Sequence, residues 1–66
     1  MQLSVNGTSK QLPQDATIAD LVVQLGLANR PVAVEVNKQL VPHRQHEQTK
    51  LSEGDQVEIV TLVGGG

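Results

Sequence analysis

The sequence predicts a small α+β domain, in which a mixed sheet of four or five strands carries one helix across one face. Three observations support this fold class. Apolar and polar residues alternate near both ends of the chain, which is typical of half-buried strands. An Asn-Gly pair at positions 6 and 7 indicates a hairpin. One amphipathic stripe at helical spacing follows, and it is too short to be a stable helix unless it packs on the sheet.

The first part of the chain is expected to form a hairpin and the start of the helix. Residues 1–6 alternate apolar and polar side chains, and residues 9–12 are expected to pair antiparallel with them. Pro13 ends the second strand, because proline has no N–H to donate to the ladder. Thr17 begins the helix as its N-cap, and Asp20 stands three positions later, as in a capping box.

The helix is expected to cover about ten residues, which makes it dependent on tertiary packing. Gly26 suits the left-handed conformation that often ends a helix, and Leu27 can make the hydrophobic contact that accompanies it. The apolar stripe is spaced i, i+3, i+4 and i+7 and comprises Ile18, Leu21, Val22 and Leu25.

The second part of the chain returns to strands. Residues 32–37 alternate with their valines inward, and a tight turn at Asn37-Lys38 leads to a short strand at 40–41. Residues 43–50 are polar throughout and are expected to form a short helical turn or a solvated loop.

The last strand is expected over residues 56–63, after a turn at 52–55 in which Gly54 supplies an unusual φ. The first and last strands are the longest and most apolar, so we expect them to be neighbours in the middle of the sheet. This order of elements gives the ubiquitin-like, or β-grasp, arrangement. Residues 1–63 would form the β-grasp domain, and residues 64–66 a flexible glycine tail.

Composition excludes several classes of function. The chain has 66 residues, enough for one small domain with a marginal core. It has no cysteine, which excludes disulfides, Cys-based zinc sites and cysteine nucleophiles. It has no Phe, Tyr or Trp on which bases could stack, and its net charge of −2 argues against nucleic acid as a partner. No signal peptide or transmembrane segment is evident, so we expect no membrane association and a cytoplasmic location.

The C-terminus is the most distinctive stretch, because Gly64, Gly65 and Gly66 are half of the 6 glycines in the chain. Ordering them would cost roughly 1–2 kcal/mol per residue, so they do not stabilise the fold. Extended, they reach about 10 Å. They are either a frayed terminus or a thin arm that carries the terminal carboxylate of Gly66 into a partner's channel, with Gly64 and Gly65 threading it. Val60 and Leu62 favour the arm, since apolar residues on the open sheet face predict a partner docking surface.

Other candidate sites have simpler interpretations. His43 and His46 have i, i+3 spacing, but Glu47 is the only nearby carboxylate, so we expect a polar loop and no metal site. No residues combine as nucleophile, base and orienting group, so we expect no catalytic residues. Four carboxylates have turn or capping roles instead, namely Asp15, Asp20, Glu53 and Asp55. Three serines lie in strands or turns and in no nucleophile elbow, namely Ser4, Ser9 and Ser52.

Any covalent reaction is therefore expected at the C-terminal carboxylate, with a partner enzyme as the catalyst. A carboxylate joined to AMP becomes a mixed anhydride with a good leaving group. Attack by a sulfur nucleophile then yields a thiocarboxylate. Glycine leaves the reacting carbonyl open, and the folded domain supplies the binding energy that positions the arm.

Three segments together are typical of one family, namely Val34-Glu35-Val36-Asn37 running through Leu40-Val41-Pro42, Gly54-Asp55-Gln56-Val57-Glu58-Ile59, and the ending Val63-Gly64-Gly65-Gly66. With these residues and its short length, the whole chain resembles the ThiS family, the sulfur carriers of thiamine biosynthesis. The Gly-Gly end alone is shared with the molybdopterin-synthase carrier subunit and with ubiquitin-like modifiers. Many relatives have tryptophan where this chain has His46.

The resemblance implies a protein co-substrate and not an enzyme. Gly66 would be adenylated by a ubiquitin-activating-like enzyme that uses MgATP, and converted to a thiocarboxylate with sulfur from a donor protein. Thiazole synthase would take the sulfur. The chain itself would bind no cofactor. Gly64 and Gly65 would line the partner's tunnel, and Val60 and Leu62 would belong to the docking face.

Two alternatives remain open on the sequence. The chain could carry sulfur in another pathway, such as molybdopterin synthesis, by the same mechanism. It could instead be a β-grasp interaction module whose tail is inert. Deleting Gly66 separates the second alternative from both carrier hypotheses, because a carrier should lose its activity whereas an inert tail should leave partner binding intact.

Overall fold

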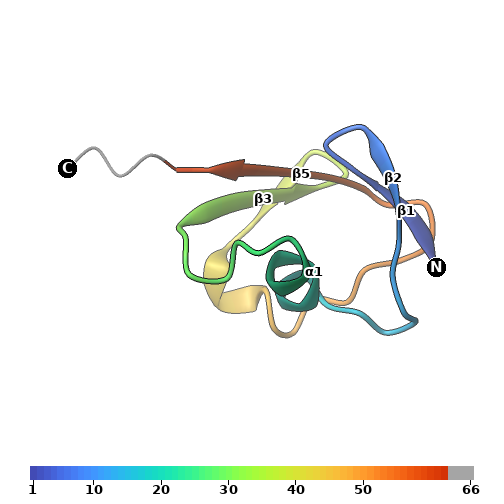
Figure 1. Cartoon of the computed structure of the whole chain (residues 1–66), viewed down its shortest axis with the longest axis horizontal. Helices are drawn as coiled ribbons and strands as arrows, with labels where there is room; N and C mark the ends of the chain where they lie inside the picture. The colour runs from blue at the N-terminus through green and yellow to red at the C-terminus, as the bar shows by residue number, and fades with distance from the viewer. Residues whose placement is uncertain (63–66) are drawn as a thin grey trace.

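Five strands form one mixed sheet in the order β2-β1-β5-β3-β4, and one α-helix covers one face of it (Figure 1). The structure is a computed structural model, and it describes residues 1–62. The elements are β1 (Gln2–Val5), β2 (Thr8–Gln11), α1 (Ile18–Gln24), β3 (Val32–Val36), β4 (Gln39–Val41), the 3₁₀ turn η1 (His43–Gln45) and β5 (Gln56–Thr61).

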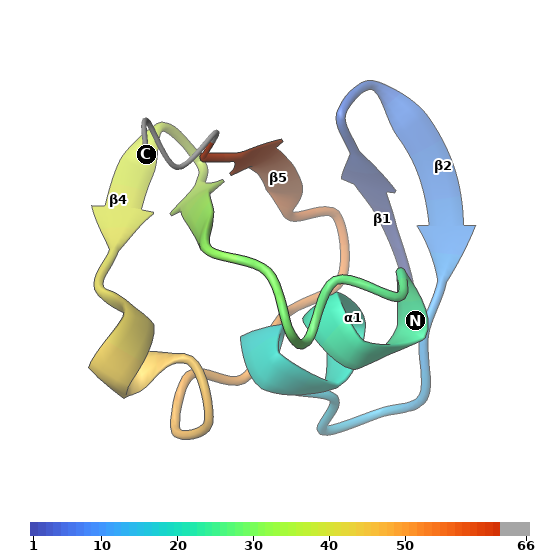
Figure 2. The same cartoon turned by 60° about the vertical axis from the view of Figure 1, so that its left-hand side comes forward.

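The pairing of the strands confirms the predicted β-grasp topology. The hairpin partners β1 and β2 are antiparallel, as are β3 and β4, whereas β1 and β5 are parallel. Strand β5 also pairs antiparallel with β3, so it lies in the middle of the sheet beside β1, as expected (Figure 2). The predicted turns are present too, since Asn6, Gly7, Asn37 and Lys38 all have positive φ.

The helix begins as the sequence predicts. The backbone N–H of Asp20 donates to Thr17 Oγ1 at 3.1 Å, and the N–H of Thr17 donates to Asp20 Oδ2 at 2.9 Å. These two bonds form a complete capping box. The helix has 7 residues, fewer than the ten expected, because Leu25 is already the C-cap.

The end of α1 is a Schellman motif. Gly26 has φ +76°, its N–H donates to Val23 O at 3.0 Å, and the N–H of Leu27 donates to Val22 O at 3.0 Å. Leu27 packs against the core, as the sequence predicts. The motif turns the chain back toward the sheet, which places the start of β3 beside the end of β5.

The core lies between α1 and the covered face of the sheet. The helix contributes Ile18 and Leu21, and the strands contribute Val34 and Val57, all fully buried. Burying such side chains stabilises the fold by about 1.5–3 kcal/mol each. The rest of the core is apolar too and consists of Leu3, Val5, Leu12, Ala16, Val22, Leu51 and Ile59.

The bounds of all five strands differ from the prediction by one or two residues. Strand β1 is one residue shorter at each end, β3 ends one residue earlier, and β4 begins one residue earlier. Strand β2 begins at Thr8 and ends before Leu12, which is a buried core residue beyond the strand. Strand β5 ends at Thr61, whereas the sequence predicted residue 63. Val63 and the predicted domain boundary after it lie outside the described residues.

Candidate functional site

Strand β5 carries the chain toward its C-terminus, and two turn asparagines hold this strand in place. The Asn6 side chain accepts from the N–H of Ile59 at 2.8 Å and donates to Ile59 O at 3.0 Å. Asn37 accepts from the N–H of Gln56 at 3.0 Å and donates to Asp55 Oδ1 at 3.0 Å. The sequence predicted both asparagines only as turn residues. Their amides also fix the start and the middle of β5.

The far end of β5 is held by β3. Thr61 lies opposite Val32, and the N–H of Leu62 donates to Pro31 O at 2.9 Å. Backbone pairing therefore continues to the last residue that the structure describes. The position of residue 62 at this end of the sheet is therefore fixed by backbone hydrogen bonding.

The predicted docking residues are exposed next to that end. Val60 is 56% exposed and Leu62 is 51% exposed, which agrees with their predicted position outside the core. Ala33 on β3 lies directly opposite Val60. Leu40 on β4 is 66% exposed, and sequence reasoning missed it as part of this surface. Whether a partner docks here stays a prediction.

Gly64, Gly65 and Gly66 lie outside the described residues. Their predicted roles, as the threading segment and the modified terminus, therefore depend on the sequence and on the position of residue 62.

The segment after β4 contains the short helical turn that was one of its two expected forms, namely η1. The expectation that the whole segment is solvated is wrong at His46. His46 is 4% exposed, and its Nε2 donates to Val41 O at 3.0 Å. Its backbone carbonyl accepts from the N–H of Ala19, and Thr49 O accepts from the N–H of Ile18. The segment thus satisfies first-turn donors of α1, which a sequence pattern of polar residues cannot reveal.

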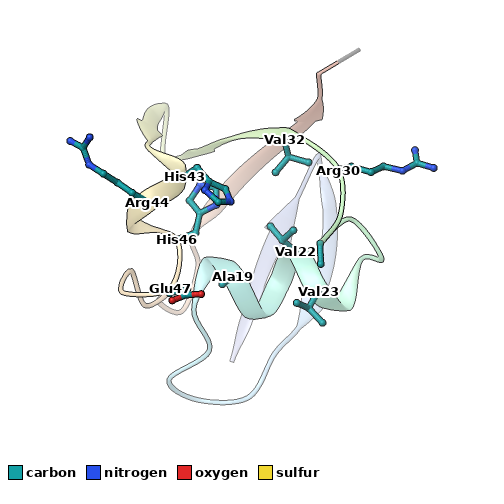
Figure 3. Close-up of a pocket in the computed structure, with 10 residues that line it drawn as sticks. Ala19, Val22, Val23, Arg30, Val32, His43, Arg44, His46 and Glu47 are labelled. Carbon is teal, nitrogen blue, oxygen red and sulfur yellow. The ribbon is translucent and has the colours of Figure 1, made fainter. Parts of the chain in front are cut away.

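The two histidines line a cavity of about 400 Å³ between α1 and η1 (Figure 3). Their rings meet edge to face with centroids 5.2 Å apart. Arg30 and Arg44 extend away from the cavity. Within residues 1–62, no three His, Cys, Asp or Glu side chains gather as metal ligands.

The acidic residues have the structural roles that the sequence predicted. Asp20 belongs to the capping box, and Asp55 Oδ2 accepts from the N–H of Ser52 at 2.8 Å. Glu53 accepts from the backbone of Gln2, and Asp15 lies 3.6 Å from Lys50 Nζ.

Comparison with known proteins finds similar proteins that match nearly the whole chain. The model of the ThiS family matches residues 3–66. The chain is 37% identical over 65 residues to the sulfur carrier protein ThiS of Bacillus subtilis, covering 97% of this chain and 98% of that protein. It is similar to a crystal structure of the thiamine biosynthesis protein ThiS of Geobacter metallireducens, with a TM-score of 0.84, 29% identity and full coverage of both chains.

Longer proteins match as well. A thiazole synthase of Paramagnetospirillum magneticum is 38% identical over 66 residues, which is all of this chain and 20% of that protein. The chain thus spans about a fifth of the length of the thiazole synthases that it matches. No helix that the structure describes is long and apolar enough to cross a membrane.

Proposed function

The chain belongs to the ThiS family, and on this basis we propose that it carries sulfur in thiamine biosynthesis on the carboxylate of Gly66. The proposal is supported by relatives of equal length named as sulfur carriers, and by a fold that fixes β5 up to the start of the tail. In this proposal the chain acts as a co-substrate of partner enzymes.

The chemistry starts at the terminal carboxylate. A carboxylate oxygen of Gly66 attacks the α-phosphorus of MgATP held by an adenylating enzyme, and pyrophosphate leaves. The terminal sulfur of a persulfide on a donor protein then attacks the carbonyl carbon, and AMP leaves with the oxygen, which gives an acyl disulfide. A thiol then attacks the donor's own sulfur in that disulfide, so the S–S bond breaks, a new disulfide forms on the donor and the thiocarboxylate leaves with the electron pair. The thiocarboxylate passes its sulfur to thiazole synthase. The chain binds no cofactor of its own, because ATP and magnesium belong to the adenylating partner.

The end of β5 sets where this chemistry can take place. From residue 62 an extended chain advances about 3.3–3.6 Å per residue, so Gly66 can enter a channel that the folded domain cannot. Gly64 and Gly65 have no side chains to widen the arm. Val60 and Leu62 dock against the partner, which holds the arm in register with the reacting groups.

Two of the partner assignments have further support. Thiazole synthases that contain a stretch similar to the entire chain support a thiazole synthase as the acceptor of the sulfur. An adenylating enzyme is the simplest activator, since a free carboxylate does not react with sulfur nucleophiles. These reactions are expected in the cytoplasm.

The test is pyrophosphate exchange with the cognate adenylating enzyme and MgATP. Deleting Gly66 leaves the terminal carboxylate on Gly65, about 3.3–3.6 Å short of its position in the parent, and should abolish exchange. Gly66→Ala should reduce kcat/KM roughly ten- to a hundredfold, because a methyl group displaces the reacting carbonyl. Both variants should melt within about 1 °C of the parent, since the glycine buries no side chain. Unchanged exchange by the deletion variant would contradict the carrier function and favour an inert tail.

A further inference from the structure

Two carboxylates face each other on the open side of the sheet. Glu35 on β3 and Glu58 on β5 are direct cross-strand partners, and both are exposed. Directly opposed side chains in an antiparallel pair have Cβ atoms roughly 4.5–5.5 Å apart, and like charges at that distance are destabilising. The pair is therefore unfavourable for the isolated domain.

No ion pair among the described residues involves either carboxylate. The ion pair and the side-chain hydrogen bonds of residues 1–62 do not involve Glu35 or Glu58. The only strand cation is Lys10, which lies opposite the buried Leu3 and so belongs to the helix-covered side. The open face of the strands carries the two carboxylates without a balancing charge.

Apolar side chains surround the acidic pair. Ala33 and Val60 are the next cross-strand pair along the same face, and Leu40 lies directly opposite Glu35 on β4. Ala33, Glu35, Glu58 and Val60 line a shallow depression of about 340 Å³. Apolar contacts around a fixed charge are the arrangement of a protein interface, in which the charged group selects the partner.

We propose that this open face docks a protein surface that presents an arginine or lysine to Glu35 and Glu58, with apolar groups against Val60 and Leu40. A cation between the two carboxylates turns their repulsion into two attractions. A second copy of this chain does not fit, because a symmetric contact would place the same acidic pair against itself.

This inference rests on the proposed function, and we assign the adenylating enzyme to this face because it must hold the arm that begins beside Val60. It adds the chemistry of recognition, namely a basic residue that meets the acidic pair beside Val60 and Leu62. Exposed opposite charges accelerate association and lose their effect in salt. Docking should therefore weaken as the ionic strength rises.

The experiment compares charge variants in stability and in binding. Glu58→Gln and Glu58→Lys remove or reverse one of the opposed charges, and Glu47→Gln is the matched control. Glu47 is exposed, follows η1 and lies on the helix side of the sheet. Binding of the full chain to the cognate adenylating enzyme is measured without ATP, so that it does not depend on adenylation.

The two readouts should move in opposite directions. Both Glu58 variants should raise the melting temperature by about 1–4 °C, because the repulsion is gone. Glu58→Gln should weaken binding about tenfold and Glu58→Lys further, and both should lose most of the salt dependence. Glu47→Gln should leave affinity within about twofold. Loss of affinity by simple damage to the fold would lower the melting temperature instead.

The result also separates this inference from the proposed function. If the parent is active in exchange and the Glu58 variants bind the adenylating enzyme as tightly as the parent does, the docking inference alone is overturned. Charge-dependent binding without exchange would support the docking inference and contradict the carrier function. Absence of binding by the parent would overturn the docking inference.

Discussion

Replacing Asn6 with alanine tests how firmly the first hairpin holds β5. The substitution removes two hydrogen bonds to Ile59, of 2.8 and 3.0 Å, each of which contributes about 1 kcal/mol. It also leaves alanine at a φ of 51°, which costs a further 1–2 kcal/mol or so. The free energy of unfolding should therefore fall by about 3–4 kcal/mol.

Glycine at the same position divides this loss into two parts. Asn6→Gly removes the same hydrogen bonds but accepts a positive φ, so it should cost only about 2 kcal/mol. Asn29→Ala is the control, because Asn29 is exposed and lies outside the described side-chain hydrogen bonds. It should change stability by less than about 0.5 kcal/mol.

Thermal unfolding followed by circular dichroism measures all three variants. In a domain of this size 1 kcal/mol corresponds to about 4–8 °C, so Asn6→Ala should melt roughly 12–32 °C below the parent. Asn6→Gly should fall between the alanine variant and the control. Equal melting temperatures for Asn6→Ala and Asn29→Ala would refute the role of the amide.

Two further pairs of substitutions test the histidine segment and the docking surface. In urea unfolding, His46→Ala should lower the free energy of unfolding by about 2–3 kcal/mol, because it leaves Val41 O without its donor. His43→Ala should lower it by less than about 0.5 kcal/mol. Similar losses for the two variants would contradict the burial of His46. Val60→Ser and Leu62→Ser should raise KM for adenylation about five- to tenfold with little change in melting temperature. Val23→Ser on the helix, 63% exposed, should not, and equal effects of all three would argue against the docking surface.

The hairpins and the helix ends could be predicted because local sequence determines them. Asn6-Gly7 and Asn37-Lys38 tolerate positive φ, and each forms the turn expected of it. The capping box at Thr17 and the left-handed Gly26 follow from patterns within a few residues. The central position of β5 followed from its length and its apolar character.

The missed features depend on residues far apart in the sequence. Asn6 reaches Ile59 across the sheet, and His46 is buried only because the segment that contains it packs against α1. The opposition of Glu35 and Glu58 is a matter of strand register, which alternation alone does not give. Residue type alone therefore does not show which polar side chains form hydrogen bonds that hold the fold together.

The tail could be predicted as a site only from its residues. Gly64, Gly65 and Gly66 resemble the reactive end of a known family, and the family comparison covers them. The structure contributes the starting point of this arm, because backbone pairing of β5 continues to Leu62.

The most direct test of the carrier function is the intact mass of the chain after incubation with its adenylating enzyme, MgATP and a sulfur donor. Replacement of one oxygen of the Gly66 carboxylate by sulfur should add about 16 Da, and fragmentation should locate the change at the terminal residue. The same mixture with the Gly66 deletion should show the unmodified mass. An unchanged mass for the intact chain, or a modification elsewhere, would contradict the account.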